Sequence, residues 1–244
     1  MSRTQIVATI GPASETPDVL YALSEAGMSV ARLNGSHNDL DWHANTIATI
    51  RKTLPSTPIL MDIPGRKIRT TQLNVEPTFK YGDTVVLTSD ASYGGDDKVP
   101  VNYPSLHEDL SAGQTVLADD GTLTFAIREV NGRDIVLEAK CDGQLKSRKG
   151  INVPYVQLRT PMVTDRDRTM MDFVVEHGVD FVGISFVESG RHVNAIRELA
   201  GGDTPRIVAK VENQPGLNNL HEILEAADAI MIDRGDLSVE TNID

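Results

Sequence analysis

The sequence predicts an α/β fold: a (β/α) TIM-type barrel that is incomplete within this chain and carries an inserted all-β domain. Apolar runs alternate with helical segments in the first and last parts of the chain, which is typical of buried parallel strands joined by right-handed crossovers. Between these parts lie short strands and Gly- and Asp-rich turns, the pattern of an all-β module. Charged residues follow several apolar runs, and in a parallel barrel the C-terminal strand ends form the active-site face.

The first part of the chain contains three strand–helix units. Strands are expected over residues 5–10, 29–33 and 58–62, and helices over residues 18–26 and 41–51. Val19, Leu20 and Leu23 repeat at helical spacing, and Gly27 follows them as a helix stop. This order predicts a parallel sheet whose strands are connected by helices.

The pattern changes after about Thr70. Strands are expected over residues 84–88, 115–118, 123–127 and 135–139, with no helix between them. Turns such as Asp119-Asp120-Gly121 separate these strands. We therefore expect an inserted β-barrel domain over residues 71–154 and a barrel domain built from residues 1–70 and 155–244.

The α/β pattern returns near Thr164. A helix over residues 164–177 has Thr164 as its N-cap and Gly178 as its stop. Further strands are expected over residues 181–186, from Arg206 towards Glu212, and over residues 229–232, with helices over residues 193–199 and 217–226. This gives six barrel strands, whereas a closed barrel of this class has eight. We expect either that two units lie outside this chain or that a second chain or a further copy completes the sheet, because an open edge favours association.

Composition excludes several classes of protein. The chain has 244 residues and a formal net charge of −12, which argues against a nucleic-acid partner because such proteins show a basic face. Cys141 is the single cysteine, so neither a disulfide framework nor a cysteine metal site is expected. The N-terminus lacks the pattern of a signal peptide, and no apolar run approaches the length of a membrane span. A soluble cytoplasmic protein without a membrane partner is the expectation.

Three charged residues follow two neighbouring strands near the end of the chain. Lys210 and Glu212 follow one apolar run, and Asp236 follows the next. Two carboxylates at strand ends can hold a divalent metal ion, and a lysine beside them can neutralise an anionic substrate. The alternative is a structural ion pair between Lys210 and one of the two carboxylates. Charge clusters at barrel strand ends favour the functional interpretation.

Three further segments carry candidate phosphate-binding groups. Arg32 to His37 ends the second strand, Asp62 to Thr70 ends the third, and Lys146 to Gly150 closes the β domain. Arginine and lysine at these places suit phosphate oxygens, and a basic hinge could lower a lid onto a phosphate. Each segment alone also fits an exposed polar or basic loop.

Several motifs, in this order along the chain, resemble those of the pyruvate kinase family. They are Thr9-Ile10-Gly11-Pro12-Ala13-Ser14, Ala26 to Asn34 with Ser36-His37, Tyr103-Pro104-Ser105-Leu106, Asp119-Asp120-Gly121, Lys146 to Asn152 with Pro154, Lys210-Val211-Glu212-Asn213-Gln214 and Arg234-Gly235-Asp236-Leu237. The resemblance runs over nearly the whole chain. It implies a barrel with a lid domain and phosphoryl transfer between phosphoenolpyruvate and ADP, with pyruvate and ATP as products.

The resemblance also implies roles for individual residues. Catalysis would fall to Lys210 and Arg32, and substrate binding to these two with Ser185 and the main-chain amides of Gly235 and Asp236. Nucleotide binding would involve Asn34, His37, Arg69 and Lys149, and Arg69 would contact phosphate. Glu212 and Asp236 would hold Mg²⁺ or Mn²⁺. Asn34, Ser36 and Asp62 match the monovalent-cation site of the family.

Five residues depart from the family pattern. Lys67 replaces a usual Glu, and its ammonium group can stand in for K⁺, so K⁺ is not expected to be required; Ile63, in place of a Thr, agrees. Arg66 replaces a Pro and could add a phosphate contact. Gly35 replaces a usual Phe. Asp233 replaces a usual Ala beside the metal site, and this extra carboxylate could change the metal affinity or the choice of substrate.

Two other functions remain open from the sequence. A metal-dependent aldolase or lyase that forms a pyruvate enolate would use a similar pair of carboxylates, but it would not need the basic segment Lys146 to Gly150. A split or non-catalytic half of a larger enzyme would bind a completing partner chain through the open edge of the sheet.

Overall fold

The structure, a computed structural model, describes residues 4–156 and 158–241. The chain divides into two compact units. The first extends to Gly65 and includes Met162–Val211 and Pro215–Ile232. The second contains Arg66–Pro161, Glu212–Gln214 and the chain from Asp233 onward. None of the helices within the described ranges is long and apolar enough to cross a membrane.

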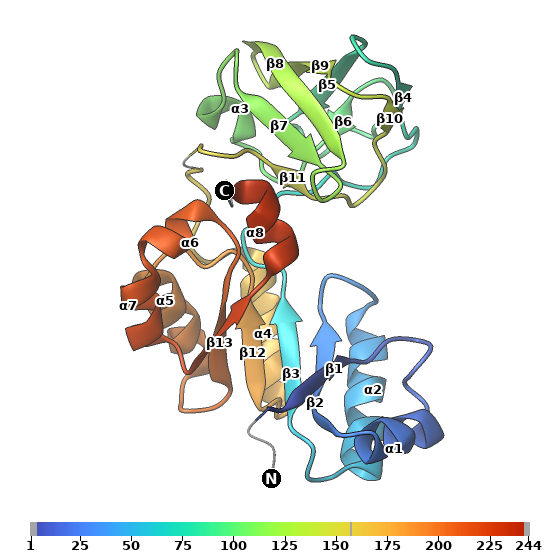
Figure 1. Ribbon diagram of the computed structural model, residues 1–244, viewed down its shortest axis with the longest axis vertical. Helices are drawn as coiled ribbons and strands as arrows, with labels where there is room; N and C mark the ends of the chain where they lie inside the picture. The colour runs from blue at the N-terminus through green and yellow to red at the C-terminus, as the bar shows by residue number, and fades with distance from the viewer. Residues whose placement is uncertain (1–3, 157, 242–244) are drawn as a thin grey trace. The chain divides into compact units, whose positions relative to one another are not determined.

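The first unit is built on a six-stranded parallel sheet with the order β1-β2-β3-β12-β13-β14 (Figure 1). The strands are β1 (Ile6–Thr9), β2 (Met28–Asn34), β3 (Ile59–Ile63), β12 (Phe181–Ile184), β13 (Arg206–Val211) and β14 (Ala229–Ile232). The helices are α1 (Pro17–Glu25), α2 (Leu40–Thr53), α4 (Asp165–Glu176), α5 (Gly190–Ala200), α6 (Gln214–Asn218, whose first residue belongs to the second unit) and α7 (Leu220–Ala226). The six expected strands and the α/β class are confirmed.

Burial on both faces of the central strands β3, β12 and β13 explains their apolar runs. Every residue of β3 is buried, including Ile59, Met61 and Ile63. Ile47 and Ile50 of α2 pack into the same core from the helical layer. A parallel sheet covered by helices removes both faces of its strands from water, so its strands are apolar throughout rather than alternating.

Side-chain caps define where the helices begin. Thr164 caps α4 in a capping box with Asp167, as its position in the sequence predicts. Asp39 caps α2 and Ser189 caps α5 with a side-chain oxygen that accepts from the backbone amide three residues later. The prediction of one helix over 217–226 was wrong, because the segment forms α6 and α7 with Asn219 between them.

An aspartate and an arginine fix the register of β3 against β12. Asp180 precedes β12, and its Oδ2 accepts hydrogen bonds from the Ile59 amide at 2.7 Å and from Arg51 Nη2 at 2.8 Å. Arg51, on α2, also donates to the Gly178 carbonyl at 2.7 Å. One carboxylate therefore satisfies the first amide of the neighbouring strand and ties a helix to the sheet.

The same arrangement recurs at β13 and β14. Asp228 precedes β14, and its Oδ2 accepts from the Ile207 amide at 2.7 Å and from Arg197 Nη2 at 2.9 Å. Arg197, on α5, also donates to the Ala226 carbonyl at 2.8 Å. Desolvation by burial opposes the ionisation of Asp228, but the hydrogen bonds from Ile207 and Arg197 outweigh it and lower its pKa.

The second unit consists mainly of β-strands. A six-stranded sheet has the order β11-β7-β8-β9-β5-β6, and a two-stranded sheet pairs β10 with β4. The strands are β4 (Thr78–Phe79), β5 (Thr84–Thr88), β6 (Val99–Pro100), β7 (Thr115–Ala118), β8 (Leu123–Asn131), β9 (Asp134–Ala139), β10 (Gly143–Gln144) and β11 (Ile151–Asn152). The four expected strands are confirmed. The expectation of no helix was wrong, because α3 (Leu106–Asp109) lies between β6 and β7.

The β domain has a separate hydrophobic core. Phe79 and Phe125 pack with their ring centroids 5.1 Å apart, and Leu87, Val116 and Leu137 are fully buried near them in the same cluster. The helix α8 (Arg234–Glu240) belongs to this unit. Each unit therefore contains its own buried apolar cluster.

Replacing Asp228 with alanine is expected to lower the free energy of unfolding by about 2 kcal/mol, because the Ile207 amide and the Arg197 guanidinium both lose a charged acceptor. Urea unfolding followed by circular dichroism measures this loss. The pKa of Asp228 is lowered from 3.8, so its contribution is present above that pH and is lost as the pH falls further through the lowered value. The exposed Asp203→Ala variant is the control, and equal unfolding midpoints for the two variants would contradict the assignment.

Candidate active site

A buried carboxylate organises the strand ends of the first unit. Asp62, on β3, is 3% exposed. Its Oδ2 accepts hydrogen bonds from the Arg32 guanidinium, with Nε at 3.0 Å, and lies 3.4 Å from Lys210 Nζ. Gly183 leaves room for this carboxylate, because a Cβ at residue 183 would lie 2.3 Å from Asp62 Oδ1. Two cations from β2 and β13 therefore neutralise one buried anion.

Lys210 is held from a second side. It is 6% exposed, and its Nζ donates to Ser185 Oγ at 3.2 Å. The Ser185 carbonyl lies against Gly65, which has a φ of 58° and no space for a Cβ. The structure thus brings together Arg32, Asp62, Ser185 and Lys210, four of the residues that the sequence selects for the site.

The loop after β2 is held by short-range hydrogen bonds. The Asn34 side chain accepts from the Ser36 amide at 3.1 Å, and the Gly35 amide donates to the Asp62 carbonyl at 2.9 Å. A Cβ at Gly35 would lie 2.5 Å from that carbonyl, so the absence of a side chain permits this close approach. The loop is therefore fixed to the same strand end that carries the Asp62 carboxylate.

His43 supports this loop from α2, a role that the sequence did not reveal. Its Nε2 lies 2.9 Å from the His37 carbonyl. Burial lowers the pKa of His43, against the opposing effects of the His37 carbonyl and the nearby Asp39. A neutral imidazole that donates from Nε2 to the carbonyl fits both observations.

Three carboxylates meet in the second unit. Oxygen atoms of Glu212, Asp233 and Asp236 lie within 4.8 Å of one another. Glu212 follows β13 and is 0% exposed, whereas Asp233 and Asp236 belong to the start of α8. Hard carboxylate oxygens are the ligands that Mg²⁺ and Mn²⁺ prefer, so this donor set fits a divalent ion. Asp233 is the extra carboxylate that the sequence places beside the expected pair of Glu212 and Asp236.

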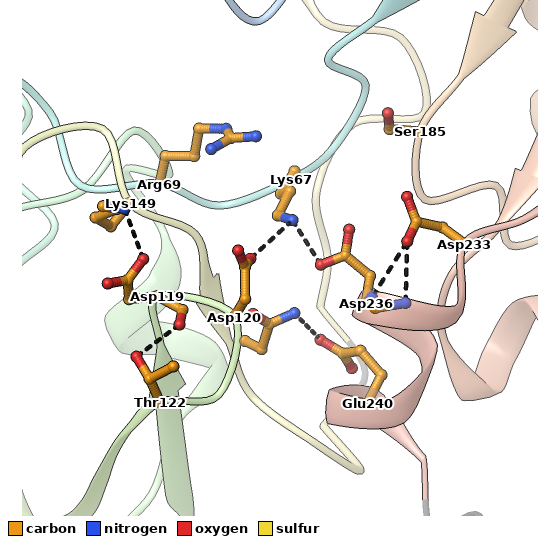
Figure 2. A network of polar contacts seen from close by, with 12 residues as sticks. Lys67, Arg69, Asp119, Asp120, Thr122, Lys149, Ser185, Asp233, Asp236 and Glu240 are labelled. Carbon is orange, nitrogen blue, oxygen red and sulfur yellow. Dashed lines mark hydrogen bonds and ion pairs between the residues drawn. The ribbon is translucent and has the colours of Figure 1, made fainter. Parts of the chain in front are cut away.

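Cations of the second unit lie beside carboxylates (Figure 2). Lys67 Nζ is 2.5 Å from Asp236 Oδ1 and 3.9 Å from Asp120 Oδ1. Lys149 Nζ is 2.7 Å from Asp119 Oδ1. Lys67 therefore contacts a carboxylate of the candidate metal group, and its substitution for K⁺ stays a prediction.

The main-chain amides expected to bind the substrate already have an acceptor. Asp233 Oδ1 lies 3.1 Å from the Gly235 amide nitrogen and 3.4 Å from that of Asp236 (Figure 2). This contact is the N-cap of α8. A substrate carboxylate at these amides would replace the carboxylate of Asp233.

Arg66 has partners other than a phosphate. Its Nε donates to Thr160 Oγ1, and its Nη2 donates to the carbonyls of Thr160 at 2.9 Å and Leu158 at 3.4 Å. Arg159, in the same segment, donates from Nε to Asp109 Oδ1 at 2.6 Å. These contacts fix residues 158–160 within the second unit, a role that the sequence did not reveal.

The parallel sheet, with cationic and carboxylate side chains at its strand ends, places the chain in the class of α/β-barrel folds. A family model described as the barrel domain of pyruvate kinase matches residues 1–244. The chain belongs to the pyruvate kinase family.

Curated relatives agree with this assignment. A pyruvate kinase of Geobacillus stearothermophilus is 42% identical over 248 residues, covering 98% of this chain and 42% of the relative. A pyruvate kinase of Clostridium perfringens is 38% identical, and the match covers 100% of this chain and 53% of the relative. A pyruvate kinase of Thermococcus litoralis is 39% identical, and the match covers 99% of this chain and 52% of the relative. The chain therefore spans about half the length of these relatives.

Replacing Gly183 with alanine is expected to displace Asp62 from Arg32 and Lys210, since the new Cβ would meet the carboxylate. Overpacking of this kind costs about 1–3 kcal/mol of stability. Urea unfolding of Gly183→Ala measures the loss. Gly202→Ala is the matched control, because a Cβ there meets nothing within 4 Å. Equal stability of the two variants would show that the Asp62 cluster tolerates the added carbon.

Proposed function

We propose that the chain carries the active-site residues of a pyruvate kinase, which transfers a phosphoryl group between phosphoenolpyruvate and ADP with Mg²⁺ or Mn²⁺. The observation that supports this most is the buried Lys210, which Asp62 and Ser185 hold at the end of β13. A lysine fixed at a strand end keeps its positive charge in one place. Phosphoryl transfer needs such positioning and charge neutralisation more than covalent chemistry.

Lys210 and Arg32 bind the phosphoryl group in this proposal. Their shared anion, Asp62, holds both cations in place before substrate arrives. Preorganised charges of this kind need no rearrangement when negative charge develops on the transferred group. Ser185 orients the Lys210 ammonium group through its hydroxyl.

Glu212 and Asp236 hold the divalent ion, which would supply positive charge to the phosphoryl and enolate oxygens. The family match and the grouping of Glu212, Asp233 and Asp236 support this assignment. The amides of Gly235 and Asp236 bind the substrate carboxylate after Asp233 has released them. Asp233 therefore weakens substrate binding relative to a chain with alanine at this position.

Asn34, His37, Arg69 and Lys149 bind the nucleotide. Arg69 Nη1 donates to the Arg148 carbonyl at 3.1 Å, a contact that orients the guanidinium. Lys149 is paired with Asp119, so it must exchange that carboxylate for a phosphate. The positive charge of Lys67 makes K⁺ unnecessary, although Asn34, Ser36 and Asp62 match the monovalent-cation site of the family.

The purified chain is expected to release pyruvate from phosphoenolpyruvate and ADP in the presence of Mg²⁺, at the same rate with and without K⁺. Coupling to lactate dehydrogenase measures this release. Lys210→Ala is expected to lower the rate by roughly 10³-fold, because a fixed charge at the transferred group is lost. Lys98→Ala, in the β domain, serves as a control for protein quality.

Three results would contradict parts of this proposal. A rate that rises steeply with K⁺ would remove the assigned role of Lys67. Formation of a pyruvate enolate and carbon–carbon cleavage without nucleotide dependence would favour the metal-dependent lyase. Failure of the chain to release pyruvate, together with activity on addition of a second polypeptide, would identify it as part of a divided enzyme.

A further inference from the structure

The ammonium group of Lys67 contacts the carboxylate of Asp236 at 2.5 Å (Figure 2). Only 10% of the Lys67 side chain and 11% of the Asp236 side chain are exposed. Charge-assisted hydrogen bonds of this kind are short and strong where water is largely excluded. The contact is therefore a substantial interaction within the second unit.

The path of Lys67 is fixed by its surroundings. A Cβ at Gly150 would lie 2.9 Å from Lys67 Cε. The aliphatic part of Lys67 therefore packs against Gly150, where a larger residue would collide with it. Asn152, two residues later, donates to Glu240 of α8 at 2.6 Å. The β domain thus holds both Lys67 and the helix that carries Asp236.

A second carboxylate lies within reach of the same ammonium group. Asp120 Oδ1 is 3.9 Å from Lys67 Nζ, and the Asp120 side chain is 74% exposed. Asp120 sits in a turn with a φ of 54°, next to Gly121. A Cβ at Gly121 would lie 3.0 Å from Val239 Cγ2, so this turn lies close to α8. Lys67 therefore has an exposed alternative partner close to its buried one.

Asp236 also belongs to the carboxylate group that fits a divalent ion. A magnesium ion binds a carboxylate oxygen at about 2.1 Å. The ammonium group already lies 2.5 Å from Asp236 Oδ1. Two cations this close to one carboxylate repel each other strongly in a site with little water, so they compete.

We propose that Lys67 is a tethered counter-ion that competes with the divalent ion for Asp236. Without the ion, Lys67 neutralises Asp236 and stabilises the carboxylate group. When the ion binds, Lys67 transfers to Asp120. The chain thus folds without metal, and its metal affinity is lowered by the cost of displacing the lysine. This inference rests on the proposed function, because it describes how the same metal site is regulated.

The Lys67→Met variant tests the competition, since methionine keeps an unbranched apolar side chain without the charge. Binding of Mn²⁺ is measured by electron paramagnetic resonance of the free ion in K⁺-free buffer. Lys67→Met is expected to bind Mn²⁺ roughly tenfold more tightly than the parent chain. Its melting temperature is expected to fall in EDTA and to recover towards the parent value in saturating Mn²⁺.

Lys98→Met is the matched control, because Lys98 Nζ lies 2.7 Å from Asp134 Oδ2 in the same β domain. It is expected to bind Mn²⁺ like the parent chain and to lose equal stability in EDTA and in Mn²⁺. The second test variant, Asp120→Asn, changes an exposed side chain at a φ that asparagine tolerates. It is expected to weaken Mn²⁺ binding, because the displaced lysine loses its alternative partner.

Glu212→Gln separates this inference from the proposed function. Unchanged Mn²⁺ binding by Glu212→Gln would overturn the metal site itself, and with it the competition. If Glu212→Gln weakens binding while Lys67→Met and Asp120→Asn bind like the parent chain, the metal site stands and the counter-ion role is overturned. Tighter binding by Lys67→Met together with weaker binding by Asp120→Asn supports the transfer of the lysine between the two carboxylates.

Discussion

The buried carboxylate of Asp62 is the constraint on which the strand-end cluster of the first unit depends. An ionised carboxylate that is 3% exposed is costly unless cations neutralise it, and here Arg32 and Lys210 supply the charge from β2 and β13. Neutralisation fixes both cations at the end of the sheet. The neighbouring strand contributes Gly183, whose missing side chain leaves the space that the carboxylate fills. The four adjacent strands β2, β3, β12 and β13 therefore all contribute to the surroundings of one carboxylate.

The charged cluster of the second unit is centred on several carboxylates rather than on one. Glu212, Asp233 and Asp236 place three carboxylates together, and Lys67 contacts this group at Asp236. Repulsion among carboxylates favours the binding of a cation, so this cluster differs from the balanced cluster around Asp62. A formal net charge of −12 therefore coexists with two sites of distinct character. One site gathers fixed cations around a buried anion, and the other gathers carboxylates whose oxygens fit a divalent ion.

The sequence predicted the elements of the fold because periodicity is a local property. Buried parallel strands were visible as apolar runs, and Thr164 was visible as a cap next to its helix. The break between α6 and α7 was not visible, since Leu217, Leu220 and Ile223 keep helical spacing across it and pack against one core. The single turn of α3 is too short to show a period. The aspartate–arginine pairs that join Asp180 and Asp228 to neighbouring strands link residues far apart in sequence, so no local pattern reveals them.

The basic segment after β3 shows why the site could be predicted only in part. The sequence presents Arg66, Lys67 and Arg69 as one cationic run suited to phosphate, but each of them has a different partner. Arg66 donates to Thr160 and the Leu158 carbonyl and fixes a connecting segment, whereas Lys67 meets the Asp236 carboxylate. Arg69 donates from Nη1 to the Arg148 carbonyl. Residue type therefore identifies which side chains suit a phosphate, whereas the partners that Arg66 and Lys67 find far along the chain are visible only in the structure.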